Sequence, residues 1–217
     1  MKHRVVIIDY QLGNLFSVRQ ACEQLGCDVT VSSSPEVLLD ADFAILPGVG
    51  AFSDAMDNMR SFGLARAVHE YVSSGKPLMG VCLGMQLLFS HSEEFGHTEG
   101  LGLIPGAVRK FDFSGPAKEE YKVPQIQWNR IEPSRPWEGT PLQGTGSGDF
   151  MYFVHSFYVV PEDPSHILSH TSYGGMRYCS AVLHGNVFAT QFHPEKSGLR
   201  GVGIYDHWLK MNTIKTV

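Results

Sequence analysis

The chain has 217 residues, of which 43% are hydrophobic and 18% are charged, and its formal net charge is −5. This length and apolar content suffice for one sizeable core, so we predict a single domain over residues 1–217. No basic run gives nucleic-acid binding an electrostatic basis, and no apolar segment is long enough to span a membrane.

The chain begins with a basic stretch and a short apolar run at residues 5–8, which Asp9 ends. A secretory signal needs a longer apolar region than this. We therefore predict that residues 4–9 form a buried first strand, and we expect the protein to be cytoplasmic.

In the rest of the first half, short apolar runs alternate with amphipathic segments. The apolar runs predict further strands at residues 28–32, 43–48 and 78–81. The intervening segments predict helices at 17–25, 35–39, 52–60 and 64–73. This alternation favours an α/β fold with a parallel sheet that helices cover on both faces.

The second half has more strands than helices. Strand-like runs occur at residues 107–111, 151–160, 180–183 and 187–191, and residues 201–211 are predicted to form a closing helix. Turn residues separate the runs. We therefore predict a mostly parallel central sheet, flanked by helices, with an antiparallel extension.

A stretch rich in proline, glycine and polar residues lies between residues 113 and 150. A long irregular segment inside a compact domain is usually functional or mobile. Its GTGSG sequence, at residues 144–148, lacks the lysine and the strand–helix context of a phosphate-binding loop, so it indicates a flexible loop.

Four cysteines in a chain of this length do not indicate a secreted disulfide framework. They include no C-x-x-C pair, so we predict no structural zinc site and no other metal. Cys22 falls on one helical face of apolar residues, and Cys179 lies in a strand-like run, so both are interpreted as core residues. Only Cys82 has unusual surroundings, between Gly80 and Gly84.

The sequence around Cys82 has the form glycine-x-nucleophile-x-glycine, in which a strand turns sharply into a helix. Here the strand would be residues 78–81 and the helix residues 83–90. The helix N-terminus would favour a thiolate, and the N–H of Leu83 would point towards a developing oxyanion. A cysteine that merely fills a tight turn has the same local pattern, so this stretch alone leaves both interpretations open.

Among the ten histidines, His193 has the most informative position. It directly follows the predicted strand 187–191, at the sheet edge where active sites of α/β proteins form. Glu195 could bind its second ring nitrogen and fix the tautomer. A turn histidine beside a surface glutamate is the alternative. Five other histidines are predicted to be surface residues: His3, His69, His91, His97 and His207.

Six motifs occur in an order that resembles one family over nearly the whole chain: DYQLGNLFSV, LPGVGAF, GVCLGMQLLF, VPQIQWN, YFVHSF and QFHPEKS. Together they resemble the class I, or triad, glutamine amidotransferases. Within that family they look like the glutaminase subunit of imidazole glycerol phosphate synthase, an enzyme of histidine biosynthesis.

The resemblance implies a Cys82–His193–Glu195 triad. Cys82 would attack the amide of glutamine, His193 would activate the thiol and protonate ammonia, and Glu195 would orient His193. The oxyanion donors implied are the N–H groups of Leu83 and Val49. Glycines around Val49 would allow its peptide to flip, which could switch the second donor on and off.

Further site residues follow from the same resemblance. Those implied to line the glutamine pocket are Gly48, Gly50, Gln86, Glu94, His155, Ser156 and Phe157. Those implied at a partner interface are Tyr152 and Lys196. Three have plain alternatives: an exposed helix position for Gln86, a strand aromatic for Tyr152 and a solvated lysine for Lys196.

The resemblance also implies two partners and no cofactor. The substrate is L-glutamine. The protein partner is a cyclase subunit with a (β/α)₈ barrel, which forms a heterodimer with the glutaminase and receives its ammonia through the barrel interior. Glutaminase activity should be low alone and should rise when the partner holds its ribonucleotide substrate.

Three residues depart from the family pattern. Gln11 stands where a glycine is common, and Gln125 and Gln127 replace the histidine and glycine of a common PHMGWN motif. These departures leave the ammonia acceptor open. The main alternative is a paralogous glutaminase that supplies a sugar amidotransferase in surface-polysaccharide synthesis. A non-catalytic binding subunit and a cysteine peptidase on the same fold are the others.

Overall fold

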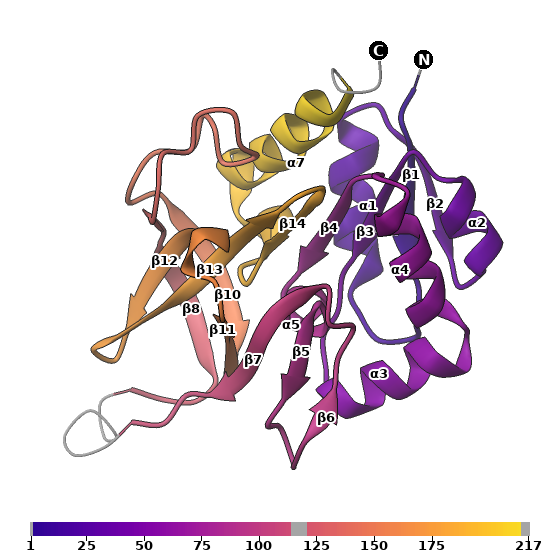
Figure 1. Ribbon diagram of the computed structural model, residues 1–217. Helices are drawn as coiled ribbons and strands as arrows, with labels where there is room; N and C mark the ends of the chain where they lie inside the picture. The colour runs from indigo at the N-terminus through magenta and orange to yellow at the C-terminus, as the bar shows by residue number, and fades with distance from the viewer. Residues whose placement is uncertain (1, 114–120, 214–217) are drawn as a thin grey trace.

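The computed structural model describes residues 2–113 and 121–213, and these residues form a 12-stranded sheet, a second sheet of two strands and helices on both faces of the large sheet (Figure 1). This architecture confirms the predicted α/β class. The large sheet divides into a parallel half and a mainly antiparallel half, and the two halves meet next to the candidate site.

The parallel half has five strands, and each pairs in parallel with its neighbour. Their spatial order is β2 (Asp28–Ser32), β1 (Arg4–Ile8), β3 (Phe43–Leu46), β4 (Leu78–Val81) and β14 (Val187–Thr190). All five were expected within two residues of their observed ends. The fifth, β14, brings a late segment of the chain next to β4.

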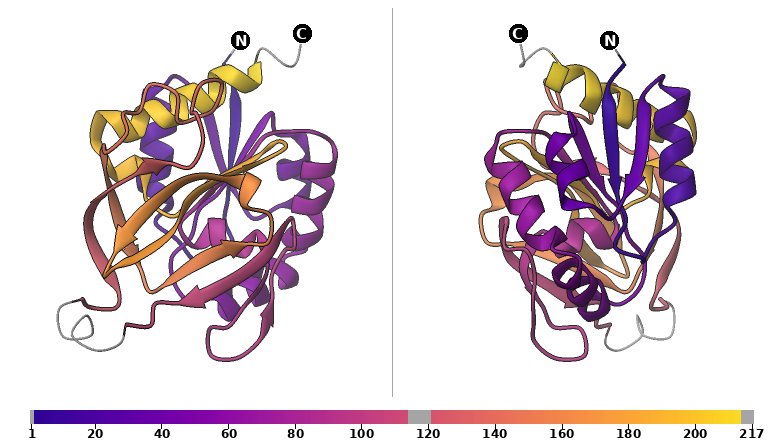
Figure 2. Two further views of the ribbon diagram at one scale, coloured as in Figure 1. Left: turned by 60° about the vertical axis from the view of Figure 1, so that its left-hand side comes forward. Right: turned by 90° about the vertical axis from the view of Figure 1, so that its right-hand side faces the viewer.

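Alternate residues of the central strands enter two separate cores. In β1, Val6 and Ile8 belong to one core, whereas Val5 and Ile7 belong to the other. Helices cover both faces, as Figure 2 shows. The first core includes residues of α2 (Pro35–Asp40), α3 (Phe52–Ser61) and α4 (Leu64–Ser73), and the second includes residues of α1 (Leu15–Gln24) and α7 (Gly198–Thr213). Strands buried on both faces explain why these runs are continuously apolar.

The second half of the large sheet continues from β14 as expected, through antiparallel pairs. Its spatial order is β13 (Met176–His184), β11 (Phe157–Pro161), β7 (Ile104–Lys110), β5 (Phe89–Ser92) and β6 (Thr98–Glu99). Two further strands lie off this path: β12 (Ile167–Tyr173) pairs with β13, and β9 (Glu132–Pro133) pairs with β12.

The predicted single strand at residues 151–160 is wrong. The segment forms β10 (Phe150–His155) and β11, which Ser156 separates. β10 pairs with β8 (Gln125–Arg130) in the two-stranded sheet, whereas β11 pairs with β7 and β13 in the large sheet. The run is apolar on both sides of His155 and Ser156, so the sequence marks the break only by these two polar residues and does not show that the pairing partner changes there.

The predicted helix at residues 83–90 is too long. Helix α5 spans only Leu83–Leu87, and the chain then enters β5. The Phe89 carbonyl accepts a hydrogen bond from Gly102 N–H (3.0 Å). Tertiary strand pairing therefore overrides the helical pattern of this apolar segment.

The stretch at residues 113–150 is only partly irregular. It contains β8 and β9, and residues 114–120 lie outside the described residues. Residues 144–148 form turns and loop, as predicted from their sequence. None of the helices in the described ranges is both long and apolar enough to cross a membrane.

Candidate active site

Cys82 lies at the sharp turn between β4 and α5, as the glycine-x-cysteine-x-glycine pattern predicts. Its backbone angles are φ 56° and ψ −111°, and it is the N-cap of α5. A non-glycine residue in this region is strained by an amount of order 1–3 kcal/mol, which the surrounding structure must offset. The strain places the thiol at the carboxyl end of β4, where the helix begins.

The two flanking glycines allow close approach of backbones. A Cβ on Gly84 would overlap the Leu46 carbonyl oxygen in β3, and a Cβ on Gly80 would lie 2.9 Å from Leu88 Cδ1 and 3.0 Å from Ala189 Cβ. Both positions therefore require glycine if α5 is to pack directly on the sheet.

His193 and Glu195 lie immediately after β14, the neighbour of β4. His193 Nδ1 is 2.7 Å from Glu195 Oε1, and both side chains are buried. Tyr205 of α7 donates a longer hydrogen bond to the other carboxylate oxygen, Glu195 Oε2 (3.4 Å). The carboxylate is thus held from two sides, and the expected pairing with His193 is present.

Electrostatics favour the charged form of His193. Burial lowers its pKa, but Cys82 and Glu195 together outweigh burial and raise the pKa to about 10. Within the described chain His193 Nε2 has no hydrogen-bond partner. Among the contributions that raise this pKa, the largest is the electrostatic attraction of Cys82, and side-chain hydrogen bonding and Glu195 add to it.

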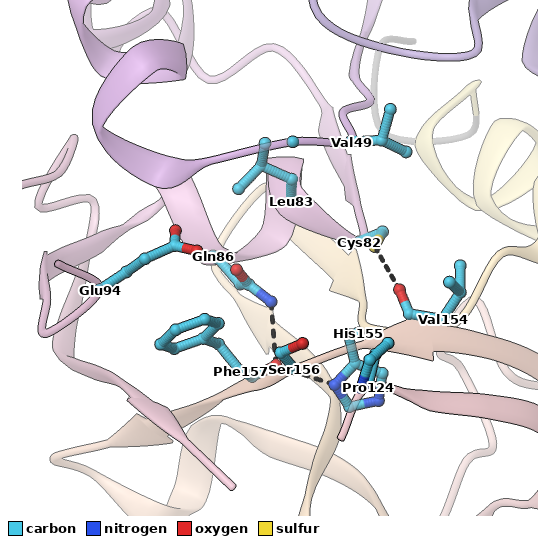
Figure 3. A pocket seen from close by; sticks show the side chains of 11 residues that line it. Val49, Cys82, Leu83, Gln86, Glu94, Pro124, Val154, His155, Ser156 and Phe157 are labelled. Atoms are coloured by element: carbon cyan, nitrogen blue, oxygen red, sulfur yellow. Dashed lines mark hydrogen bonds between the residues drawn. The ribbon is translucent and has the colours of Figure 1, made fainter. Parts of the chain in front are cut away.

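A pocket of about 240 Å³ opens beside Cys82 (Figure 3). It is lined by Val49, Gly50, Cys82, Leu83, Gln86, Glu94, Pro124, Val154, His155, Ser156 and Phe157. Figure 3 shows Cys82 between Val49 and Val154. The pocket brings together six of the seven residues expected to bind glutamine. The exception is Gly48, which does not line it, and Pro124 and Val154 were not expected.

Gln86 is buried and not on an exposed helix face, so that alternative is wrong. Its Nε2 donates to the Phe157 carbonyl (3.0 Å) and to Gln191 Oε1 (3.1 Å). Both amide hydrogens are thus used, and Oε1 remains as an acceptor. Glu94 lines the same pocket, and its Oε2 accepts a hydrogen bond from Phe52 N–H (2.7 Å).

Two residues that line the pocket with Cys82, Leu83 and Val49, have backbone N–H groups without a protein partner in the part of the chain that the structure describes. Neither Leu83 N–H, in the first turn of α5, nor Val49 N–H has a protein acceptor within residues 2–113 and 121–213. The buried Tyr10 donates a hydrogen bond to the Pro47 carbonyl (2.7 Å) and so holds the loop that precedes Val49. These N–H groups are the two that were expected to stabilise an oxyanion.

His155 is a buried neutral imidazole, because burial lowers its pKa to about 4. Its Nδ1 is 2.8 Å from the Phe157 carbonyl, and its Nε2 is 3.3 Å from Tyr178 Oη. Tyr178 also donates to Gln125 Oε1 (3.0 Å). The off-pattern Gln125 is therefore part of a buried polar network that reaches the pocket.

The other two off-pattern residues are exposed. Gln127 lies on β8, and Gln11 follows β1 with a φ of 67°, where its N–H donates to Asp9 Oδ1 (2.8 Å). Gln11 thus adopts a left-handed conformation that glycine adopts without strain, which agrees with the glycine common at this position in the family.

Tyr152 and Lys196 lie together beside the site. The Lys196 ammonium is 5.9 Å from the centre of the Tyr152 ring, and the Tyr152 carbonyl accepts a hydrogen bond from His193 N–H (2.9 Å). The Trp128 ring is 6.1 Å from that of Tyr152. A partly exposed aromatic pair, Trp128 and Tyr152, therefore borders His193.

Sequence reasoning missed two buried residues that contact the triad. Tyr205 contacts Glu195, and Gln191 Nε2 lies 3.8 Å from Cys82 Sγ. The signal for Gln191 was a polar residue at the end of an apolar strand, at the first position of the QFHPEKS motif. Among the described residues, no three His, Cys, Asp or Glu side chains are arranged to hold a metal ion.

A family model described as glutamine amidotransferase class-I matches residues 6–203 of this chain. The chain belongs to the class I glutamine amidotransferase family. The resemblance of the six motifs to this family is thus confirmed.

Two curated relatives are similar along nearly their whole length. The imidazole glycerol phosphate synthase subunit HisH of Syntrophotalea carbinolica is 48% identical over 204 residues, covering 92% of this chain and 96% of the relative. The subunit of the same name from Geobacillus kaustophilus is 46% identical over 207 residues, covering 95% and 96%. The solved structure of PurLQS from Thermotoga maritima is similar in fold, with a TM-score of 0.73, 21% identity and coverage of 97% of this chain and 99% of that chain.

Proposed function

We propose that this chain is the glutaminase subunit of an imidazole glycerol phosphate synthase. It hydrolyses L-glutamine to glutamate and ammonia and supplies the ammonia to a cyclase subunit in histidine biosynthesis. One observation carries the proposal: Cys82, on its strained turn, shares a site with the buried His193–Glu195 pair of the adjacent strand end. The names of the similar HisH subunits support the pathway and give no support to the polysaccharide alternative.

In the proposed reaction the Cys82 thiolate attacks the side-chain carbonyl carbon of glutamine. The resulting oxyanion accepts hydrogen bonds from Leu83 N–H and Val49 N–H. The imidazolium of His193 gives its proton to the leaving nitrogen, and ammonia departs from a γ-glutamyl thioester. His193, now neutral, takes a proton from water, and the hydroxide releases glutamate and restores the thiolate–imidazolium pair.

The pocket has the polarity that the α-ammonium group of glutamine requires. Gln86 offers only its Oε1, because both hydrogens of its amide are engaged, and Glu94 has one carboxylate oxygen free of Phe52. Two oxygen acceptors at one end of the cavity suit three ammonium hydrogens. We therefore assign Gln86 and Glu94 to the amino-acid end of the substrate, with Gly50 and the segment from His155 to Phe157 closing the pocket. Gly48 acts through the backbone of the Val49 loop.

A face of the two-stranded sheet supports the proposed docking of the cyclase barrel. Alternate residues of the paired strands β8 and β10 face outwards, and three of them are large and exposed: Ile126 by 60%, Trp128 by 51% and Phe150 by 49%. Tyr152 lies on this face with Lys196 over its ring. An apolar, aromatic face of this kind is typical of an interaction site. Its position next to Cys82 would allow ammonia to pass to the partner without reaching solvent.

The proposal also covers the number of domains and the cellular location. One domain over residues 1–217 is supported by the single large sheet, in which β14 from the end of the chain pairs with β4 from its first half. A cytoplasmic location stays a prediction.

The test is glutamate release from glutamine by the wild-type chain and by Cys82→Ala, with Cys179→Ala as a matched control because Cys179 is also a buried cysteine. We expect Cys82→Ala to lose all glutamine turnover and Cys179→Ala to keep it. In complex with the cyclase subunit, Cys82→Ala should still support product formation from added ammonia. Glutamine turnover by a folded Cys82→Ala would refute the assignment of the nucleophile.

A further inference from the structure

Gln191 is a fully buried amide directly after β14, two residues before His193. Its Oε1 accepts a hydrogen bond from Gln86 Nε2 (3.1 Å), and its Nε2 lies 3.8 Å from Cys82 Sγ. It therefore bridges a substrate-pocket residue and the nucleophile. Neither the family motifs used above nor the proposed mechanism gives this side chain a role.

The neighbours of Gln191 fix which end of its amide faces the sulfur. The Phe157 carbonyl is only an acceptor, so the Gln86 atom that lies 3.0 Å from it must be the nitrogen. That nitrogen also contacts Gln191, so the contacting atom of Gln191 must be its oxygen. The NH₂ group of Gln191 is then the end that faces Cys82.

Cys82 Sγ thus has contacts of two kinds. The Val154 carbonyl, at 3.7 Å, can only accept a hydrogen bond and so favours the protonated thiol. The Gln191 amide can donate to the sulfur and so favours the thiolate, since hydrogen bonds to a charged partner are the stronger kind. Among the described residues, the titratable side chains that are electrostatically coupled to Cys82 are His193 and Tyr10. The balance between the two neutral contacts acts in addition to these groups on the fraction of Cys82 that is nucleophilic.

We propose that Gln191 is a further catalytic residue, whose side-chain amide donates to Cys82 Sγ, holds the sulfur as a thiolate and couples it to Gln86 in the glutamine pocket. The proposal rests on the proposed function, in which Cys82 is the nucleophile. Coupling follows from the shared hydrogen bonds. When the ammonium group of glutamine binds Gln86 Oε1, the Gln86 amide donates more strongly to Gln191, which in turn donates more strongly to the sulfur.

The test is the pH dependence of Cys82 alkylation by iodoacetamide, followed at the peptide level by mass spectrometry. The assay uses the full chain without glutamine or the partner. It therefore measures the fraction of Cys82 that is present as thiolate and does not depend on turnover. The variants are Gln191→Met, which keeps the volume but has no donor, and Gln191→Glu, which keeps the shape but replaces the donor. Ser180→Ala is the matched control, because it removes a buried hydrogen bond to Ser169 in the neighbouring strands and leaves Gln191 intact.

We expect the pH of half-maximal alkylation to rise by about one unit in Gln191→Met, which means about tenfold less thiolate at a fixed acidic pH, as for loss of one hydrogen bond to a charged group. Gln191→Glu should show at least this shift, and Ser180→Ala none. An unshifted profile in a Gln191 variant that melts like the Ser180→Ala control would overturn the proposal.

A second measurement needs no Gln191 variant to fold. In ¹⁵N-labelled wild-type chain, the side-chain NH₂ signals of Gln191 should shift as Cys82 titrates, and this response should vanish in Cys82→Ala. Signals that ignore the titration of Cys82 would also overturn the proposal. A chain that shows both effects but hydrolyses no glutamine would instead refute the proposed function and leave the Gln191–Cys82 contact standing.

Discussion

At the scale of single residues, the site depends on groups whose charge or conformation is held by buried neighbours. Cys82 keeps a left-handed backbone conformation at its turn, and the pKa of His193 is raised to about 10 despite burial. Glu195, buried with it, supplies part of that increase through its hydrogen bond and charge. The charged form of His193 and the turn that presents Cys82 are thus in place before any substrate binds.

The raised pKa of His193 predicts an alkaline limit to activity. Protonation of the leaving ammonia needs the imidazolium, which persists at neutral pH and is lost as the pH rises through about 10. Glu195→Gln removes a negative charge that raises this pKa, so its alkaline limb should lie at lower pH than that of the wild type. The measurement is the pH profile of glutamate release between pH 6 and about 10.5. This range covers both the ordinary pKa of histidine and the raised pKa of His193.

The control for this profile is Glu162→Gln, an exposed carboxylate remote from the triad, which corrects for alkaline unfolding. Its limb should coincide with that of the wild type. The same shift makes the imidazolium a stabilising group at neutral pH, a contribution that is lost as the pH approaches 10. A Glu195→Gln limb at the wild-type position would contradict the assigned role of Glu195.

The residues that the sequence predicted best are those with local motifs. Cys82 lies between glycines that a tight strand–helix turn requires, and His193 follows a strand end, so both could be placed on the same sheet edge. Gln191 and Tyr205 could not be assigned a role in this way. Gln191 contacts Cys82, which is distant in the chain, and Tyr205 contacts Glu195 from helix α7. Neither contact leaves a local pattern in the sequence.

At the scale of elements, the pocket is built where strands change partners. The break at Ser156 sends β10 to the small sheet and β11 to the large one, and the residues at the break line the pocket. The sequence marks this position only by the polar residues His155 and Ser156, and they do not show that the strands on either side join different sheets. It could show the parallel half, because strands buried on both faces have continuous apolar runs that glycine and proline end.

The contact between α5 and β3 gives a prediction at this scale. A Cβ at Gly84 would overlap the Leu46 carbonyl oxygen, so Gly84→Ala must push α5, and with it Cys82, away from the sheet. We expect the free energy of unfolding to fall by about 1–3 kcal/mol, as for other overpacked cores. Glutamate release should fall at least about tenfold, since a shift of the nucleophile weakens its alignment.

Gly203→Ala is the matched control for this change. Gly203 lies inside α7, and a Cβ there would meet nothing within 4 Å. The control should keep full activity and gain up to about 1 kcal/mol from the higher helix propensity of alanine. Thermal unfolding and the glutaminase assay measure both variants, and a Gly84→Ala protein as active and stable as the control would show that the close packing of α5 is not needed.

At the scale of the whole molecule, the fold brings the chemical site and an exposed apolar face to the same side. The triad lies at the junction of the parallel and antiparallel halves, and the outer face of β8 and β10 begins next to it. β8 was not predicted, although Gln125–Asn129 alternates polar and apolar residues, because it lies within a stretch rich in proline, glycine and polar residues that was interpreted as irregular. The proposed docking surface therefore depends on strand pairing that only the three-dimensional structure reveals.

The measurement that tests the central claim most directly is the rate of glutamate release in three states. These are the chain alone, the chain with the cyclase subunit, and the chain with that subunit and its ribonucleotide ligand. If Val49 N–H completes the oxyanion site only in the loaded complex, the rate should rise by about 10²–10³ in the third state, the value of one such donor. A rate that is the same in all three states would contradict the proposed subunit role and would direct the search towards another ammonia acceptor.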